Sequence, residues 1–291
     1  MKKLLSSVLL LLLASLSIAD AQHAGRGGQG RQHRDLFEGG SVYATADDGT
    51  PLKWRVFPAA VPGPHPAVLI IHGGGFRSEP FSPNMLRAAR EAAAMGCNAF
   101  LVQYRLAFPN RLPGQVTPGC FPDQTNDLKK AVRAARQYPG GNGKVGAIGG
   151  SAGASHAVYL AATGTKGDDR LDAVVALSGA YDFVELTSHP DPLFKRVTRN
   201  YVCSFSIEAK RKASPVNYID ATVSPLFLIA SDNELMPPEQ LTGLVAKLKE
   251  AGATNYKQLV RPNSQRHSFS YWPDVSEPAL EFLKQHLGPT G

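Results

Sequence analysis

The stretch VGAIGGSAGASHAVYLAA, residues 145–162, combines a strand pattern and a helical pattern around one serine. Apolar residues typical of a buried strand run over 145–149, and a helical pattern follows over 152–162. Between them the letters GGSAG fit the pattern G-x-S-x-G, with Ser151 at the centre. Small residues allow a sharp turn that exposes the serine hydroxyl, and a helix N-terminus favours negative charge there. An ordinary turn of small residues is the alternative, but the strand-turn-helix context favours a nucleophile.

Strand-length apolar runs alternate with helical patterns on both sides of this stretch. The expected strands are 67–72, 99–106, 145–149, 173–178, 226–230 and 256–260, after a hairpin at 42–57. The expected helices are 83–95, 123–137, 152–162, 238–251 and 275–286. This alternation predicts an α/β fold with a mostly parallel sheet, helices on both faces, and functional groups at the carboxyl ends of the strands.

The segment 181–220 interrupts the alternation with Tyr, Phe and Pro residues and no clear strand. We interpret it as a small cap-like insertion over the carboxyl edge of the sheet. The expected catalytic domain therefore covers residues 41–288 and includes this insertion. A hydrophobic content of 43% in a chain of 291 residues suits one such domain.

The N-terminus has the features of an export signal. Lys2 and Lys3 precede an apolar run over 4–18, and Ala19 and Ala21 supply small residues for cleavage, so residues 1–21 are expected to be a signal peptide. The run is too short for a stable membrane anchor, and we expect a periplasmic or secreted protein. The Gly/Arg-rich segment 22–40 is interpreted as flexible, and export argues against a nucleic-acid partner despite the net charge of +7.

Three cysteines would meet an oxidising compartment after export. Cys120 and Cys203 both lie in loop-like sequence, whereas Cys97 opens an apolar strand-like run. We therefore hypothesise a disulfide between Cys120 and Cys203, with Cys97 free and buried.

Ser151 needs a base that removes its proton, and the base needs an acid that orients it. With a serine in this kind of turn the chain order is serine, acid, histidine. His267, in RPNSQRHSFSYW (residues 261–272), follows the last expected strand and fits the base. Asp232 comes directly after the strand 226–230 and its following serine, whereas Glu234 lies three residues beyond that serine, so both are candidates for the acid.

A second glycine-rich stretch, VLIIHGGGFRSEP at residues 68–80, also follows an expected strand. Glycines there can turn backbone N–H groups toward an anionic oxygen, although a plain turn is the simpler explanation. Attack by Ser151 on a carbonyl creates an oxyanion that needs two or three N–H donors about 3 Å away. We assign these donors to Gly74, Gly75 and Ala152.

Together these motifs resemble the α/β-hydrolase superfamily, and within it the hormone-sensitive lipase-like esterases and exported carbohydrate esterases. The matching stretches are HGGGF at 72–76, YRLA at 104–107, FPDQTNDLKKAV at 121–132, GGSAGA at 149–154, and His267. The resemblance implies an α/β-hydrolase fold, with Ser151 as nucleophile, His267 as base, and Gly74, Gly75 and Ala152 as oxyanion donors. It also implies that Arg105 and Asp127 form a structural pair.

Two departures from the pattern matter. Only a short segment precedes the first strands where relatives carry a helical cap, which predicts an open site, and the acid loop lacks the common G-x-x-D-P form. We expect a serine esterase acting on short acyl or aromatic esters, such as those on plant polysaccharides. The alternatives are a short-chain lipid esterase, a peptidase or amidase, or a non-catalytic binding protein. Neither metal-ligand spacing nor a dinucleotide-binding glycine motif is present, so no cofactor or metal is expected.

Overall fold

The computed structural model describes residues 36–80, 82–107 and 117–288. The strands are β1 (Ser41–Thr45), β2 (Pro51–Phe57), β3 (His65–Ile71), β4 (Asn98–Val102), β5 (Gly141–Gly150), β6 (Ala173–Leu177), β7 (Leu226–Ser231) and β8 (Tyr256–Arg261). The helices are α2 (Pro83–Ala94), α3 (Asp123–Arg136), α4 (Ala152–Thr163), α5 (Phe183–Leu186), α6 (Pro192–Val202), α7 (Ile207–Ala213), α8 (Pro238–Glu250) and α9 (Trp272–Leu287). Two short 3-10 turns are η1 (Pro215–Tyr218) and η2 (Ser268–Tyr271).

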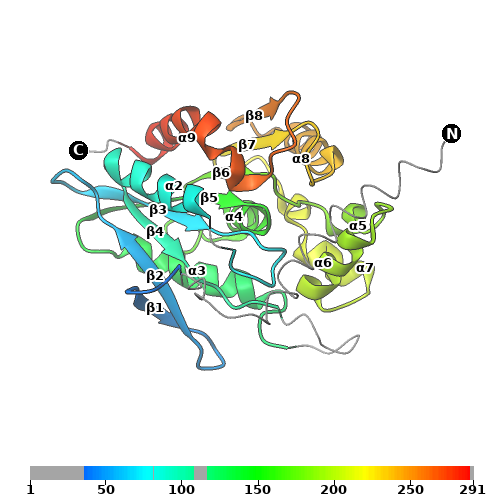
Figure 1. Ribbon diagram of the computed structural model, residues 1–291, viewed down its shortest axis with the longest axis horizontal. Helices are drawn as coiled ribbons and strands as arrows, with labels where there is room; N and C mark the ends of the chain where they lie inside the picture. Colours follow the sequence, from blue (N-terminus) through cyan, green and yellow to red (C-terminus); the bar gives the residue numbers. More distant parts are fainter. Residues whose placement is uncertain (1–35, 81, 108–116, 289–291) are drawn as a thin grey trace, which may run out of the picture. The chain divides into compact units, whose positions relative to one another are not determined.

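The eight strands form one sheet in the order β1-β2-β4-β3-β5-β6-β7-β8 (Figure 1). The hairpin β1–β2 is antiparallel and pairs antiparallel with β4, whereas all pairs from β4 to β8 are parallel. This arrangement is the α/β-hydrolase fold, and it confirms the mostly parallel sheet expected from the sequence. The carboxyl ends of β3, β5, β6, β7 and β8 consequently meet at one edge.

Helices cover both faces of the sheet because the buried strands are apolar on both sides. In β3, the side chains of Ala67, Leu69 and Ile71 join a core with α3, α4 and α8, whereas Val68 and Ile70 join a second core with α2 and α9. All residues of β3 are buried. This alternation explains why the strand pattern in the sequence is a continuous apolar run.

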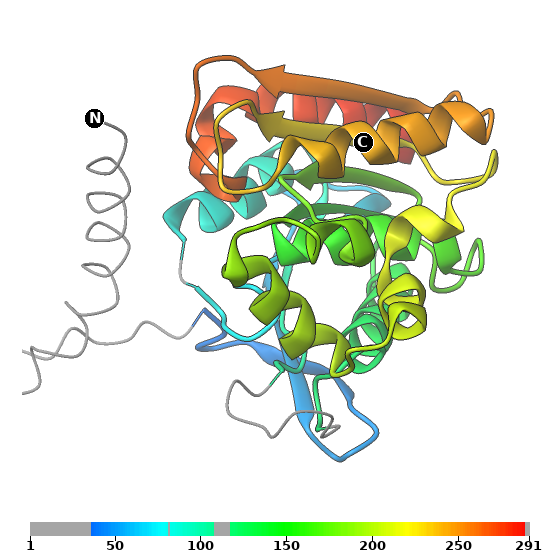
Figure 2. The same cartoon turned by 90° about the vertical axis from the view of Figure 1, so that its right-hand side faces the viewer.

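The segment after β6 is a helical insertion that comprises α5, α6 and α7 (Figure 2). Asp191 begins α6 by accepting a hydrogen bond from the Leu193 N–H at 2.8 Å, and Pro192 occupies the first turn, where no helical partner is lost. A third core, centred on Phe76, Phe183 and the α6 aromatics, joins the insertion to the rest of the domain.

The cysteine hypothesis is confirmed. Cys120 and Cys203 form a disulfide that joins the start of α3 to the end of α6, and Cys97 is free and buried. Burial raises the pKa of the Cys97 thiol to about 12, so this side chain behaves as a small apolar group. The expected pair is also present: Arg105 contacts Asp127 at 2.9 Å and additionally reaches Asp48 of the β1–β2 turn.

The expected signal peptide and most of the segment 22–40 lie outside the described residues. The last part of that segment is packed rather than free, because Leu36 and Phe37 are buried in the core that contains α2 and α9. The ordered domain therefore starts before residue 41, since these two apolar side chains have a core to join. Among the described helices, none is both long and apolar enough for a membrane span.

Candidate active site

Ser151 lies in the turn between β5 and α4, with φ 53° and ψ −119°. A non-glycine residue with positive φ is strained, and its neighbours must hold it in place. They do so through close backbone contacts that exclude side chains: a Cβ atom on Gly149 would lie 2.3 Å from the Gly153 carbonyl oxygen, and one on Gly153 would lie 2.2 Å from the Ile71 carbonyl oxygen. The G-x-S-x-G pattern is therefore a steric requirement of this turn.

The glycine loop after β3 lies directly against Ser151. A Cβ atom on Gly73 would come within 3.0 Å of the Ser151 Cβ and 2.9 Å of the Gly150 carbonyl oxygen. Gly74 has φ 99° and no room for a side chain, because its Cβ would lie 2.1 Å from the Ser78 carbonyl oxygen. The glycine run thus brings its backbone to the serine, as the sequence pattern predicts.

The three N–H groups assigned to the oxyanion must have no other acceptor if they are to bind it. Within the described residues, the N–H groups of Gly74, Gly75 and Ala152 donate to no protein acceptor. Gly75 also has a positive φ of 58°, and Ala152 is the first residue of α4, whose N-terminus favours negative charge. These donors are therefore available to an oxygen placed beside Ser151.

His267 and Glu234 contact each other through His267 Nδ1 and Glu234 Oε2. The Glu234 side chain is fully buried, whereas the His267 side chain is 22% exposed. The other carboxylate oxygen, Oε1, accepts hydrogen bonds from the Ser231 N–H at 2.8 Å and the Ser178 hydroxyl at 2.9 Å. A carboxylate held in this way orients the imidazole so that its Nε2 is left for chemistry.

Asp232, the other candidate acid, contacts a different group. Its carboxylate accepts hydrogen bonds from the Asn263 N–H at 2.7 Å and the Ser264 N–H at 3.0 Å, and no contact with His267 occurs among the described residues. The hydrogen bonds from these backbone groups lower the pKa of Asp232 below its usual value. Asp232 therefore ties the β7 loop to the β8 loop, and of the two candidates Glu234 alone reaches the histidine.

The base loop packs on the serine turn. A Cβ atom on Gly150 would lie 2.1 Å from the Ser268 hydroxyl oxygen and 2.7 Å from the Phe269 ring. Since Gly150 precedes Ser151 and Ser268 follows His267, this contact places the loop that contains His267 against the turn that contains Ser151. The loop that contains His267 thus leaves no room for a side chain at Gly150, the second glycine of GGSAG.

Sequence reasoning missed Ser178, which follows β6 and bonds the Glu234 carboxylate. It also missed Tyr271, whose hydroxyl contacts Ser178 at 2.7 Å. The available signal was a polar residue at the carboxyl end of a buried strand, since such residues gather at the same edge as Ser151.

Two buried histidines lie behind the glycine loop. The His72 ring stacks on Tyr104, with centroids 4.3 Å apart, and the His156 Nε2 donates to the Gln124 side-chain oxygen at 2.9 Å. Gln124 uses its amide NH2 to reach the carbonyl oxygens of Phe76 and Gly119, so its oxygen faces the imidazole. Burial lowers the pKa of His72 to about 4 and that of His156 to about 3, and both are neutral at ordinary pH.

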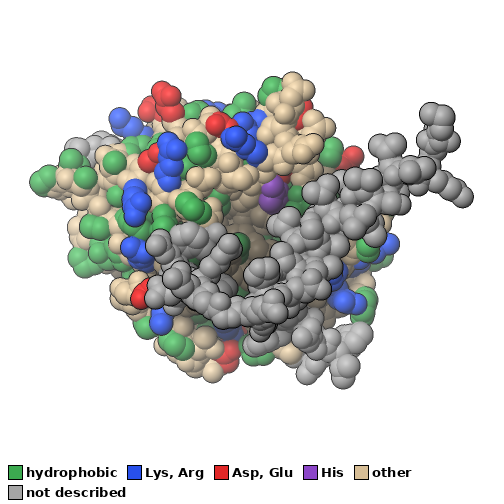
Figure 3. All heavy atoms as spheres, viewed as in Figure 1, with side chains coloured by type: hydrophobic (Ala, Val, Ile, Leu, Met, Phe, Trp, Pro, Cys, Tyr) green, Lys and Arg blue, Asp and Glu red, His purple; other side chains and the backbone are tan. Residues whose placement is uncertain are grey.

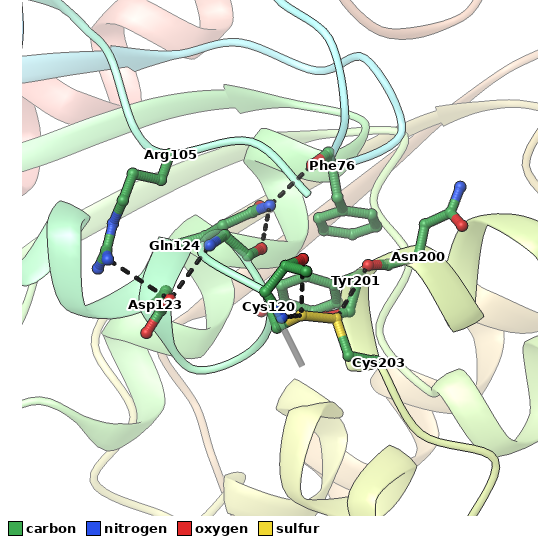
Figure 4. Close-up of a disulfide and its surroundings, with 10 residues drawn as sticks. Phe76, Arg105, Cys120, Asp123, Gln124, Asn200, Tyr201 and Cys203 are labelled. Atoms are coloured by element: carbon green, nitrogen blue, oxygen red, sulfur yellow. Dashed lines mark hydrogen bonds and ion pairs between the residues drawn. A yellow bond between two sulfur atoms is a disulfide. The ribbon is translucent and has the colours of Figure 1, made fainter. Parts of the chain in front are cut away.

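The insertion forms a wall beside the glycine loop. The Phe76 ring stacks on Tyr201 of α6 with centroids 4.1 Å apart, close to the disulfide (Figure 4). The Phe121 N–H donates to the Tyr201 carbonyl oxygen at 2.8 Å. A Cβ atom on Gly75 would lie 3.6 Å from the Val197 side chain of α6. The surface of this face is hollowed, with a histidine side chain at the rim of the hollow (Figure 3).

No group of His, Cys, Asp or Glu side chains within the described ranges is arranged to hold a metal ion. The site's own side chains and backbone donors offer a strained serine, a histidine with a carboxylate, and N–H groups without a protein acceptor. That set of groups is suited to acyl transfer through a covalent intermediate.

Comparison with known proteins agrees with this geometry. Residues 56–248, well over half of the chain, match the family model BD-FAE. A Mycobacterium tuberculosis protein, "Probable carboxylic ester hydrolase LipM", is 29% identical over 148 residues, which are 45% of this chain and 34% of that protein. The match with this curated relative therefore spans about a third of its length.

Solved structures of an esterase show the same fold. "Thermogutta terrifontis esterase 2 phosphonylated by sarin" aligns with a TM-score of 0.71 and 19% identity over 89% of this chain and 99% of that chain. The propionate-bound Est2 from the same Planctomycetes species aligns with a TM-score of 0.66 and 21% identity, over 87% and 96% of the two chains. With the family model matched over most of the sheet and the fold shared along the domain, the chain belongs to BD-FAE, a family of α/β-hydrolase esterases.

Proposed function

We propose that this protein is a serine carboxylic-ester hydrolase in which Ser151 is the nucleophile, His267 the base and Glu234 the orienting acid. His267 Nε2 takes the proton from the Ser151 hydroxyl as the oxygen attacks the ester carbonyl carbon. The carbonyl oxygen becomes an oxyanion held by the N–H groups of Gly74, Gly75 and Ala152.

The intermediate then loses its alcohol, and His267 gives that leaving oxygen the proton. A water molecule, deprotonated by His267, attacks the acyl-enzyme, and the carboxylic acid leaves as Ser151 regains its proton. Glu234 stays a carboxylate throughout and stabilises the imidazolium that forms in each half of the reaction.

One observation carries this proposal: the loop that contains His267, bound to Glu234 through Nδ1, packs on the strained turn that contains Ser151. An imidazole whose Nδ1 is already occupied has Nε2 free, and its loop neighbour Ser268 lies against the residue before the nucleophile. The membership of an esterase family supports the same reaction type.

For the substrate, we propose short acyl or aromatic esters of the kind that decorate plant polysaccharides, met outside the cytoplasm after export. The propionate in the Thermogutta terrifontis Est2 structure supports a short acyl group. Two apolar side chains of the insertion are exposed: Phe205, 59% exposed, before α7, and Ile207, 55% exposed, at its first position. An exposed aromatic ring can stack on a sugar face, which suits a glycan-bound ester.

The test is hydrolysis of p-nitrophenyl acetate through octanoate by the wild type and by Ser151→Ala, Glu234→Gln and Asp232→Asn. We expect Ser151→Ala to lose kcat by ~10⁵-fold or more and Glu234→Gln by ~10³- to 10⁴-fold, because a triad acts as a unit. Asp232→Asn is the matched control, since it neutralises a carboxylate in the same loop, and its kcat should stay within about threefold of the wild type.

An Asp232→Asn loss larger than that of Glu234→Gln would reverse the assignment of the acid, and full activity of Ser151→Ala would end the proposal. Acetylated and feruloylated xylan then test the substrate. Hydrolysis of the small esters without release of acetate or ferulate from xylan would leave the reaction intact and refute the glycan substrate.

A further inference from the structure

Ser178 is a buried residue at the carboxyl end of β6, with a positive φ of 57°. Its hydroxyl oxygen contacts groups from two other loops: Glu234 Oε1 at 2.9 Å in the β7 loop, and the Ser268 N–H at 3.0 Å in the base loop. The Tyr271 hydroxyl lies 2.7 Å away on its other side. One side chain thus joins the acid of the proposed triad to the residue after the base.

The direction of these hydrogen bonds follows from which atoms can donate. The Ser268 N–H can only donate, so the Ser178 oxygen accepts there. The Glu234 carboxylate can only accept, so the single proton of the Ser178 hydroxyl points to Oε1. The Tyr271 hydroxyl also has one proton, which is shared between the Ile229 carbonyl oxygen at 2.9 Å and the Ser178 oxygen at 2.7 Å.

We propose that Ser178 is a positioning residue that fixes the rotation of the Glu234 carboxylate and the place of the His267 loop, so that Oε2 meets Nδ1. The proposal rests on the triad proposed above and deepens it. Ser178 acts through Glu234 and Ser268 and touches none of the reacting atoms.

A glutamate needs such a partner more than an aspartate would. Its side chain has an additional rotatable bond, and its carboxylate can turn unless both oxygens are held. Oε1 has two donors, the Ser231 N–H and the Ser178 hydroxyl, while Oε2 is left for His267. Without Ser178, one donor remains for Oε1, and the Ser268 N–H loses its acceptor at the same time.

Because φ of Ser178 is positive, one substitution can separate an effect on the position of the Glu234 carboxylate from an effect on the stability of the fold. Glycine adopts this conformation without strain, so Ser178→Gly removes the hydroxyl and relieves the backbone. Ser178→Ala removes the hydroxyl and keeps the strain. Ser214→Ala is the matched control: the hydroxyl of this buried serine likewise accepts from one backbone N–H, that of Phe183, and donates to one oxygen, the Lys210 carbonyl, but it lies in the insertion away from the Glu234 carboxylate.

The experiment measures kcat and KM on p-nitrophenyl acetate, the melting temperature, and the far-downfield proton NMR signal of the hydrogen bond between His267 and Glu234. We expect Ser178→Ala and Ser178→Gly to lower kcat by ~10- to 100-fold, the effect of losing a hydrogen bond to a charged group, with KM within about twofold. The downfield signal should move or broaden in both, even if Ser178→Gly melts no lower than the wild type. Ser214→Ala should keep the signal in place whatever its melting temperature.

Two results overturn the proposal: wild-type kcat in Ser178→Gly, or loss of kcat in step with melting temperature while the signal stays unchanged. Failure of the triad itself is distinguishable, because Glu234→Gln would then keep its activity and the wild type would lack the signal.

Discussion

The site has a serine side, which comprises the glycine loop and the turn around Ser151, and an acid-base side, which comprises Glu234, His267 and Ser178. Different kinds of contact hold the two sides in place. On the serine side, backbone atoms set the geometry: Gly153 lies against the Ile71 carbonyl, and Gly73 against Ser151. On the other side, side chains set it, because Glu234 is held by His267, Ser178 and one N–H group. Close backbone contact admits glycine alone, whereas a hydrogen bond can be donated by several residue types. The first side should therefore fail abruptly under substitution and the second by degrees.

Among substitutions that keep all three residues of the proposed triad, the largest effect is expected from Gly153→Ala. The new methyl group would lie 2.2 Å from the Ile71 carbonyl oxygen and 2.6 Å from that of His72, and neither backbone group can move without shifting β3. Because a displacement of about 1 Å at a reacting group can cost ~100-fold, kcat/KM should fall by at least that factor, with a large drop in melting temperature. The measurement is ester hydrolysis alongside thermal unfolding.

Gly243→Ala supplies the control for Gly153→Ala. Gly243 lies inside α8, and nothing lies within 4 Å of its added Cβ. Alanine should stabilise this helix by ~1 kcal/mol and leave kcat unchanged. Near-normal activity in Gly153→Ala would show that the serine turn adapts, and the distinction between the two sides would be lost.

The two sides should also differ in their response to acid. Behind the glycine loop, His156 is neutral in the folded protein, because burial lowers its pKa to about 3, while an unfolded histidine titrates at about 6.5. Above that value neither state takes up the proton, so stability is fully present. As the pH falls through 6.5 toward the folded value, only the unfolded chain gains the proton, and the free energy of unfolding falls by ~1.4 kcal/mol per pH unit. His72, with a pKa of about 4, should add a similar slope above that pH.

Urea unfolding at pH 7, 6 and 5 tests this expectation, with His156→Gln as the comparison because an amide can still donate to Gln124. The variant should lose stability less steeply on acidification, by about one proton, and differ from the wild type by a constant amount above pH 7. Parallel curves for the two proteins would show that His156 does not limit acid stability.

The outline of the fold could be predicted from the sequence because strands and helices leave periodic patterns. The structure extends β3 by two residues at its start, to His65, and ends the expected strand 99–106 at Val102. Beyond Val102 the chain leaves the sheet, since Tyr104 bonds the His72 carbonyl and Arg105 bonds Asp127. Those partners lie 32 and 22 residues away, and no local pattern encodes them.

The same distinction between local patterns and long-range contacts separates the site residues that could be predicted from those that could not. The glycines and Ser151 stand in one short motif each, so their contacts could be inferred from letters that are adjacent or nearly so. The choice between Asp232 and Glu234 could not, because it depends on where the loop after β7 turns. The role of Ser178 depends on a contact across 56 residues to Glu234 and 90 residues to Ser268. Long-range side-chain hydrogen bonds are thus the part of the site that the motifs do not contain.

The smallest effect is expected from Tyr271→Phe. It tests whether substitutions on the acid-base side cause graded losses of activity. The tyrosine hydroxyl lies one hydrogen bond further from the carboxylate than Ser178, and its loss removes a neutral hydrogen bond to the Ser178 hydroxyl. A neutral hydrogen bond contributes ~1 kcal/mol, so kcat should fall by ~2- to 5-fold. Tyr43→Phe is the control, since its hydroxyl also bonds a backbone carbonyl, that of Gln103, but on the β1–β2 hairpin.

The decisive measurement is the double variant Ser178→Gly with Tyr271→Phe. If the tyrosine acts through Ser178, the double variant should lose no more activity than Ser178→Gly alone. Fully additive losses would mean that Tyr271 contributes to activity independently of Ser178. The acid-base side would then consist of separate contacts rather than one hydrogen-bonded chain.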